Sequence, residues 1–108
     1  MDLEGKLSLN GYIDLVQLSC INQDKKFIFV IDVFRLKKEP ALYEKAVLLL
    51  KEILGDPSRL KVMHSCQQDA VALWSCMGIE MQSLFDTSGS HIYLQQRQIY
   101  HENIKNSQ

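Results

Sequence analysis

Two β-rich runs that flank a short polar turn are the feature that most limits how this chain can fold. The first run, Tyr12–Cys20, alternates apolar and polar residues with one change of phase, and the second, Phe27–Ile31, is apolar throughout. Between them, Asn22–Lys26 is polar and typical of a turn. A connection this short cannot make the crossover that parallel strands require, so the two runs should pair as an antiparallel hairpin.

The rest of the chain alternates between helical and strand periodicity. Two amphipathic helices and two short strands are predicted: helices over Pro40–Leu54 and from Ser65 to Gly78, and strands over Leu60–Met63 and Ile79–Phe85. Ser65 with Gln68 three residues later reads as a capping box. A last helix, capped by Asp86 or Ser88, is expected to reach about Tyr100, followed by a frayed tail. Strands joined by helices in a chain of 108 residues predict one α/β domain at most.

Composition narrows the class of protein. Twelve basic and thirteen acidic side chains give a formal net charge of −1, without the basic excess of proteins that coat nucleic acids. The longest apolar runs are far shorter than the ~20 residues that cross a bilayer, and the N-terminus has no apolar signal segment. The three cysteines form no C-x-x-C pair, which favours reduced thiols. We therefore expect an intracellular protein, cytoplasmic or nuclear, with no membrane partner.

Three acidic residues are candidates for metal chemistry. Asp2 and Glu4 form a D-x-E pair, and on an extended segment both side chains would point to one face. Paired carboxylates suit a hard cation such as Mg²⁺, although a solvated chain end gives the same pattern. Asp69 lies within the second predicted helix, beside its apolar face, where aspartate is a poor helix former and costly to bury. A helix dipole, a solvated groove or a metal ion could each account for Asp69.

Taken in order, four stretches resemble the DEDD-type 3′–5′ exonuclease family, which includes ribonuclease D and the Werner-type exonucleases. These stretches are Asp2–Gly5, Ile13–Leu18, the pair Phe29–Asp32 and Lys61–His64 with Asp69 following, and Leu84–Thr87. Within the family, the resemblance is strongest to the Egalitarian and exonuclease 3′–5′ domain-containing branch. The last two stretches, with their spacing, are more specific than the first.

The resemblance implies a ribonuclease-H-like α/β fold, with a mixed sheet in which an antiparallel hairpin precedes parallel strands joined by crossover helices. It also implies two-metal hydrolysis of phosphodiester bonds with Mg²⁺ or Mn²⁺. Asp2 would bridge the two ions, Glu4 would bind the first, and Asp69 would help to hold the second through water. The substrate would be the single-stranded 3′ end of RNA or DNA, and Asp86 would have a structural role as a helix cap.

The sequence departs from the family pattern at both ends. No aspartate follows Asp86, so the family's fourth carboxylate, with its water-orienting Tyr or His, has no match. Only Met1 precedes Asp2, where the family has the apolar residues of a central strand. We therefore expect residues 1–108 to be a partial domain without the central strand and the C-terminal helices, inactive or nearly so alone. The alternative is a catalytically inactive fold that binds RNA or a protein partner, including a second copy of itself.

Overall fold

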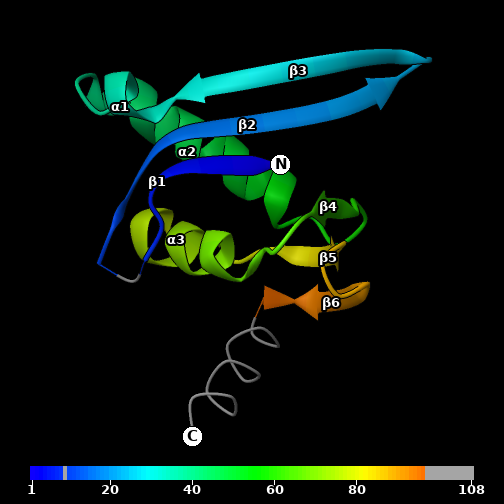
Figure 1. Ribbon diagram of the computed structural model, residues 1–108. Helices are drawn as coiled ribbons and strands as arrows, with labels where there is room; N and C mark the ends of the chain where they lie inside the picture. Colours follow the sequence, from blue (N-terminus) through cyan, green and yellow to red (C-terminus); the bar gives the residue numbers. More distant parts are fainter. Residues whose placement is uncertain (9, 97–108) are drawn as a thin grey trace, which may run out of the picture.

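The computed structural model describes residues 1–8 and 10–96, and this part of the chain forms two three-stranded sheets and three helices (Figure 1). The first sheet has the strand order β1-β2-β3, and the second has the order β4-β5-β6. The elements are β1 (Asp2–Lys6), β2 (Tyr12–Asn22), β3 (Lys25–Asp32), α1 (Val33–Leu36), α2 (Pro40–Leu54), β4 (Lys61–Met63), α3 (Gln67–Met77), β5 (Gln82–Asp86) and β6 (His91–Gln95). This mixed α/β architecture confirms the predicted fold class.

β2 and β3 form the predicted antiparallel hairpin, and β1 pairs antiparallel with the other edge of β2. The hairpin turn consists of Gln23 and Asp24, both with positive φ. Two successive residues with positive φ are typical of a type I′ turn, whose twist matches that of the flanking strands. Both strands are consequently longer than the sequence predicted, and the tip of the hairpin reaches well beyond the other elements (Figure 1).

The second sheet contains the predicted parallel pair and one unpredicted strand. β4 and β5 pair in parallel, and α3 makes the crossover between them. β6 then turns back and pairs antiparallel with β5. The sequence predicted a helix that begins at Asp86 or Ser88, and over the described residues this prediction is therefore wrong. Instead, residues 87–90 form a turn, and the segment after it pairs with β5, with Tyr93 buried opposite Leu84. Residues 97–108, with the expected helix end and tail, lie outside the described residues.

The bounds of α2 agree with the sequence prediction, from Pro40 to Leu54. Proline fits the first helical position because its ring fixes φ and its missing N–H would have no partner there. α3 also ends as predicted, at Gly78 in the left-handed conformation. Its start differs, however: Ser65 has a positive φ, and Cys66 occupies the N-cap position without a side-chain cap bond. The predicted capping box is therefore wrong.

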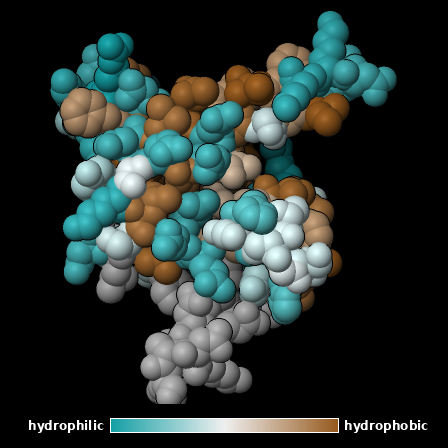
Figure 2. All heavy atoms as spheres, in the orientation of Figure 1, coloured by the Kyte–Doolittle hydropathy of each residue, from teal (hydrophilic) through white to brown (hydrophobic). Residues whose placement is uncertain are grey.

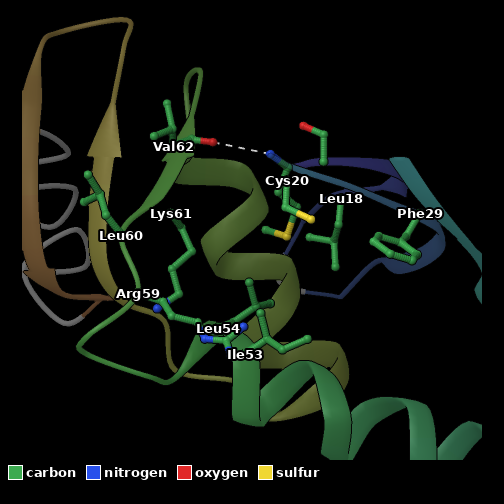
Figure 3. A pocket seen from close by; sticks show the side chains of 11 residues that line it. Leu18, Cys20, Phe29, Ile53, Leu54, Arg59, Leu60, Lys61 and Val62 are labelled. Carbon is green, nitrogen blue, oxygen red and sulfur yellow. Dashed lines mark hydrogen bonds between the residues drawn. The ribbon is translucent and has the colours of Figure 1, made fainter. Parts of the chain in front are cut away.

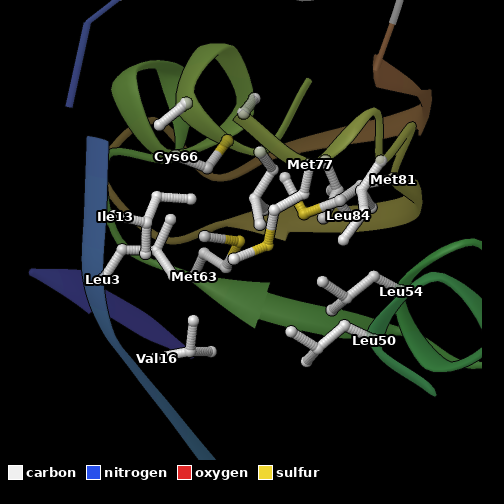
Figure 4. Close-up of a cluster of buried hydrophobic side chains, with 14 of the residues drawn as sticks. Leu3, Ile13, Val16, Leu50, Leu54, Met63, Cys66, Met77, Met81 and Leu84 are labelled. Carbon is white, nitrogen blue, oxygen red and sulfur yellow. The ribbon is translucent and has the colours of Figure 1, made fainter. Parts of the chain in front are cut away.

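A single hydrophobic core lies between α3, the C-terminal half of α2 and the strands (Figure 4). Its largest fully buried side chains include Ile13 and Val16 of β2, Leu50 and Leu54 of α2, and Leu84 of β5. These residues come from both sheets, so the core holds the sheets to the helices even though they are separate ladders. Within the described residues, no helix is long and apolar enough to cross a membrane.

The two sheets meet at the N-terminus of β1. The amino group of Met1 donates a hydrogen bond to the carbonyl oxygen of Val62 in β4 at 3.3 Å. In the described part of the chain, β1 has strand pairing only with β2, and β4 only with β5. A sheet divided at this point agrees with the expectation of a mixed sheet without its central strand.

Candidate metal centre

β1 holds Asp2 and Glu4 on one side of the first sheet. Leu3, between them, is buried in the core, while Asp2 and Glu4 are exposed. Because strand side chains alternate between faces, burial of Leu3 directs both carboxylates to the opposite face, as predicted. The backbone N–H of Leu3 donates to Oδ1 of Asp2 at 3.0 Å, which restrains that carboxylate.

Regular pairing of β1 is interrupted directly after Glu4. Glu4 is opposite Leu15, but Gly5 is opposite Ile13, so the register shifts between Glu4 and Gly5. Gly5 has a φ of 142°, and a Cβ at this position would lie 2.4 Å from the carbonyl oxygen of Tyr12. Only glycine fits so close an approach between the two strands. The bulge therefore fixes the point at which the strand that carries both carboxylates bends.

Asp69 lies in the first turn of α3 and is only 8% exposed. Burial, the largest cause, together with the negative charges of Asp2 and Glu4, raises the pKa of Asp69 to about 6, and the amino group of Met1 opposes this rise. The structure thus brings the helical carboxyl group within electrostatic range of both strand carboxylates. An aspartate that is buried near two like charges is costly to ionise.

The donor chemistry of these three residues fits a divalent cation. Their carboxylate oxygens are the ligands that Mg²⁺ and Mn²⁺ prefer. A cation would offset both the burial of the Asp69 charge, which is the main cause of its raised pKa, and the smaller contribution of Asp2 and Glu4. In residues 1–8 and 10–96, however, no group of three or more His, Cys, Asp or Glu side chains is arranged to hold a metal ion. The three carboxylates are therefore coupled electrostatically without forming a closed set of ligands.

Asp86, at the end of β5, anchors the start of α3. Its Oδ1 accepts hydrogen bonds from the backbone N–H groups of Ser65 and Ser88 at 2.9 and 3.0 Å and from the Ser88 hydroxyl at 2.7 Å. Its Oδ2 accepts from the backbone N–H of Cys66 at 3.1 Å and from its Sγ at 3.3 Å. Burial acts to raise the pKa of Asp86, but these donors outweigh it and hold the pKa well below its usual range. Asp86 therefore has the structural, helix-capping role that the resemblance implied.

The Cys66 thiol lies against this carboxylate. Burial, followed by the hydrogen bond to Asp86 and the charge of Asp86, raises the pKa of Cys66 to about 12. A thiol with so high a pKa stays protonated at neutral pH and is a poor nucleophile. The interpretation of the cysteines as thiols buried like small hydrophobic residues therefore holds for Cys66, but Cys20 is exposed and Cys76 is only partly buried.

Sequence reasoning missed one residue that positions α3. Gln96 is 1% exposed; its Oε1 accepts from the backbone N–H of Met81, and its Nε2 donates to the carbonyl oxygen of Ala70, both at 2.8 Å. Gln96 therefore connects the end of β6 to the start of β5 and to the helix that carries Asp69. No local pattern marks a glutamine for this role, because its partners lie 15 and 26 residues away in the sequence.

The domain has a mixed α/β fold in which a strand and a packed helix place three carboxyl groups within electrostatic range of one another. The family model described as 3′–5′ exonuclease matches residues 2–101 of this chain. The chain therefore belongs to the 3′–5′ exonuclease family, which confirms the resemblance found in the sequence.

Two curated relatives from Arabidopsis thaliana each match about three quarters of the chain. Protein RRP6-like 2 is 34% identical and Protein RRP6-like 1 is 30% identical, each over 80 residues, or 74% of this chain. The matched region covers only 8% and 11% of the lengths of these relatives, respectively. No solved structure matches the chain.

Proposed function

We propose that this chain carries part of the metal centre of a 3′–5′ exonuclease, with Asp2, Glu4 and Asp69 as ligands of Mg²⁺ or Mn²⁺. When bound, such ions activate water for attack and stabilise the leaving oxygen of a phosphodiester. The substrate would be the single-stranded 3′ end of RNA or DNA. Membership of the exonuclease family supports this proposal, and the observation that carries it is the coupling of Asp69 to both strand carboxylates.

The role of the protein side chains in this proposal is to hold negative charge in place before the metal arrives. Asp2 and Glu4 are fixed on one strand face by the burial of Leu3, and Asp69 is fixed on a helix that Asp86 anchors. A ligand set on a strand and a helix is more rigid than one on loops, so less entropy is lost when the ion binds.

We also propose that residues 1–108 are a partial domain with little or no hydrolytic activity by themselves. No aspartate follows Asp86 in the sequence, so a fourth carboxylate at the family's spacing is missing from these residues. The same observation favours a second candidate function, a catalytically inactive exonuclease fold that binds RNA or a protein. These two functions differ in whether nucleic-acid binding needs the metal.

Titration with Mn²⁺ tests the ligand assignment. We expect calorimetry to detect binding in the millimolar range for the unmodified chain and no binding for Asp2→Ala. Asp24→Asn is the control, because it removes an exposed carboxylate from the hairpin turn, keeps a residue that tolerates the positive φ there, and should leave the titration unchanged. Equal binding by the chain and by Asp2→Ala would refute the assignment.

An assay on 5′-labelled single-stranded RNA separates the two functions. If the chain is part of an exonuclease, its affinity for the RNA should rise when Mn²⁺ is added, and Asp2→Ala should lose that rise. If the chain is an inactive binding module, the unmodified chain and Asp2→Ala should bind the RNA equally well with and without Mn²⁺. Shortening of the RNA by this chain, abolished by Asp2→Ala, would contradict our proposal that residues 1–108 are nearly inactive alone.

A further inference from the structure

β3 is an edge strand in the described part of the chain, and its middle is apolar. It pairs with β2 over its whole length, from Lys25 to Asp32, in a regular register without a bulge. Along its other edge it has no strand partner among the described residues. Its four central side chains are between 42% and 59% exposed: Phe27, Ile28, Phe29 and Val30. A long, regular, apolar edge of this kind is a template for another strand.

The edge of β3 lacks the features that usually protect such a strand. Proline, a bulge, an inward-pointing charge or a covering segment are the common devices. β3 contains neither proline nor glycine, and its charged residues lie only at its ends, with Lys25 and Lys26 at the start and Asp32 at the last position. α1, which follows Asp32, contacts β2 and α2, so it turns back toward the sheet and leaves the outer edge of β3 open.

Both faces of β3 carry apolar side chains beside this edge. Phe29 lies with Leu18 and Cys20 of β2 along one wall of a groove of about 550 Å³ (Figure 3). Ile28 and Val30 point to the opposite face, because strand side chains alternate, and both are more than half exposed. Figure 2 shows hydrophobic residues along the upper rim of the molecule, where the hairpin lies, and hydrophilic residues at its tip. A strand that fits this edge must therefore offer apolar side chains on both of its faces.

β3 itself meets this requirement, because its sequence is complementary to a second copy that runs antiparallel. The strand reads Lys-Lys-Phe-Ile-Phe-Val-Ile-Asp, with its positive charges at the start and its negative charge at the end. Antiparallel pairing of two copies would therefore bring opposite charges together at both ends. A closed dimer of this kind has a two-fold axis perpendicular to the sheet, which places one residue of β3 opposite its own copy.

The charges select one position for this axis. With the axis at Phe29, Lys26 of each copy is opposite Asp32 of the other. An axis one residue earlier would place Asp24 opposite Asp32, and an axis one residue later would place Ile28 opposite Asp32. The first alternative faces like charges and the second faces a charge with an apolar side chain, so both are less favourable. The axis at Phe29 gives the cross-strand pairs Lys26–Asp32, Phe27–Ile31, Ile28–Val30 and Phe29–Phe29.

We propose that the chain forms a two-fold symmetric dimer in which the β3 edges of two copies pair antiparallel about Phe29. The first sheets of the two copies would join into one continuous sheet, and the apolar residues of both edges would be covered. Asp2 and Glu4 lie on β1, at the opposite edge of the first sheet. The dimer would therefore leave the proposed metal centre open.

The two charged groups of each end pair are accessible. Lys26 is exposed and has no ion pair within the described residues. The carboxylate of Asp32 accepts a hydrogen bond from the backbone N–H of Arg35 at 3.1 Å and lies 3.7 Å from the Arg35 guanidinium. The Asp32 side chain is nevertheless 51% exposed, and an exposed pair between neighbouring residues is weak. Asp32 can therefore also meet Lys26 of a second copy.

Sedimentation equilibrium of the full chain over a wide range of concentration tests the dimer. We expect the mass to rise from 12.5 kDa to twice this value as the concentration increases. Lys26→Glu should weaken dimerisation about tenfold, because two attractive pairs become repulsive. Lys25→Glu is the matched control: it makes the same change of charge one residue away, but Lys25 is opposite Val33 in the proposed register and should alter the dimerisation constant less than about twofold.

A mixture of two variants tests the register. Asp32→Lys alone should dimerise as weakly as Lys26→Glu, because two lysines would face each other at each end. An equimolar mixture of Lys26→Glu and Asp32→Lys should dimerise about as tightly as the unmodified chain, since each end of the mixed dimer again joins opposite charges. Circular dichroism should show that all three variants keep the fold. If Asp32→Lys does not fold, the comparison of Lys26→Glu with Lys25→Glu decides by itself.

Four results would overturn the proposal. They are a mass that stays at 12.5 kDa at every concentration, growth beyond the dimer, equal weakening by Lys26→Glu and Lys25→Glu, and a mixture of folded variants that dimerises no more tightly than either variant alone. A monomeric chain that binds single-stranded RNA and loses this binding in Lys26→Glu would assign the edge to RNA and would also overturn it.

Discussion

Replacement of Asp86 by asparagine should destabilise the fold strongly at neutral pH, although the two side chains have nearly the same shape. The amide would keep one oxygen acceptor for the Ser65 and Ser88 donors, but an NH₂ group would replace the oxygen that faces Cys66. The change removes the negative charge that strengthens all these bonds. Asp86→Asn therefore tests whether an ionised cap from β5, and not the local sequence, secures the start of α3.

The magnitude follows from the hydrogen bonds. A backbone bond to a charged acceptor is worth about 1 kcal/mol more than a bond to a neutral one, so the donors of Ser65 and Ser88 lose about 2 kcal/mol together. The N–H of Cys66 is left buried without an acceptor, at a cost of about 1–3 kcal/mol. We therefore expect the free energy of unfolding to fall by about 3–5 kcal/mol, a large part of the total for a small domain.

The loss should depend on pH with a definite sign. The pKa of Asp86 is lower in the folded state than in the unfolded state, so its contribution is complete above the unfolded value of about 3.9. As the pH falls below about 4, the unfolded state binds the proton first, and the contribution of the carboxylate is lost. The difference between the unmodified chain and Asp86→Asn should accordingly shrink in acid.

Urea denaturation followed by circular dichroism at about pH 7 and about pH 3 measures both effects. Asp24→Asn is the control, because it makes the same chemical change at an exposed turn position and should alter stability by no more than about 0.5 kcal/mol. A difference below about 1 kcal/mol at neutral pH, or one that does not narrow in acid, would refute the argument for an ionised cap.

Two further substitutions test the surroundings of α3. Asp69→Asn should stabilise the chain by about 1–2 kcal/mol at about pH 8 and have no effect near pH 4. The pKa of Asp69 is raised to about 6 in the folded state, so ionisation of Asp69 destabilises the fold only above the pKa of the unfolded state, about 3.9. Solvent screening keeps the gain below the full value that this pKa difference would give. Urea denaturation at the two pH values checks the sign, and a destabilised variant at the higher pH would contradict it. Gln96→Leu leaves a buried N–H and a buried C=O without partners and should cost about 2–4 kcal/mol in the same measurement. Gln68→Leu, at an exposed position of α3, should cost far less.

The elements that the sequence predicted well have their signals within a few residues. α2 begins at Pro40 and ends before Gly55, which is its C-cap, and the polar turn between β2 and β3 joins an antiparallel pair. The D-x-E pair needed only the alternation of a strand, so the shared face of Asp2 and Glu4 was also predictable. Each of these features depends on local backbone chemistry, which sequence patterns report directly.

The features that the sequence could not supply depend on contacts across the fold. Ser65 and Gln68 have the spacing of a capping box, but the start of α3 is capped by Asp86, 20 residues after its N-cap Cys66. The segment after Asp86 forms a turn and then β6 instead of a helix, and Tyr93 is buried opposite Leu84 of β5. The wrong cap and the wrong helix both reflect tertiary contacts that outweigh a local preference: the contact of Asp86 with the start of α3, and the pairing of β6 with β5.

The two aspartates that serve α3 have opposite environments, and this contrast separates a structural carboxylate from one kept for chemistry. Asp86 is surrounded by donors, so its negative charge stabilises the fold without any ligand. Asp69 is buried near two other carboxylates, so its charge destabilises the fold. A residue selected for stability alone would not stay ionisable in such a place, because asparagine or alanine would cost less. A cation that neutralises Asp69 would explain its unfavourable charge. For this reason the raised pKa of Asp69 supports Asp69 as the helical ligand of the proposed metal centre, in preference to Asp86.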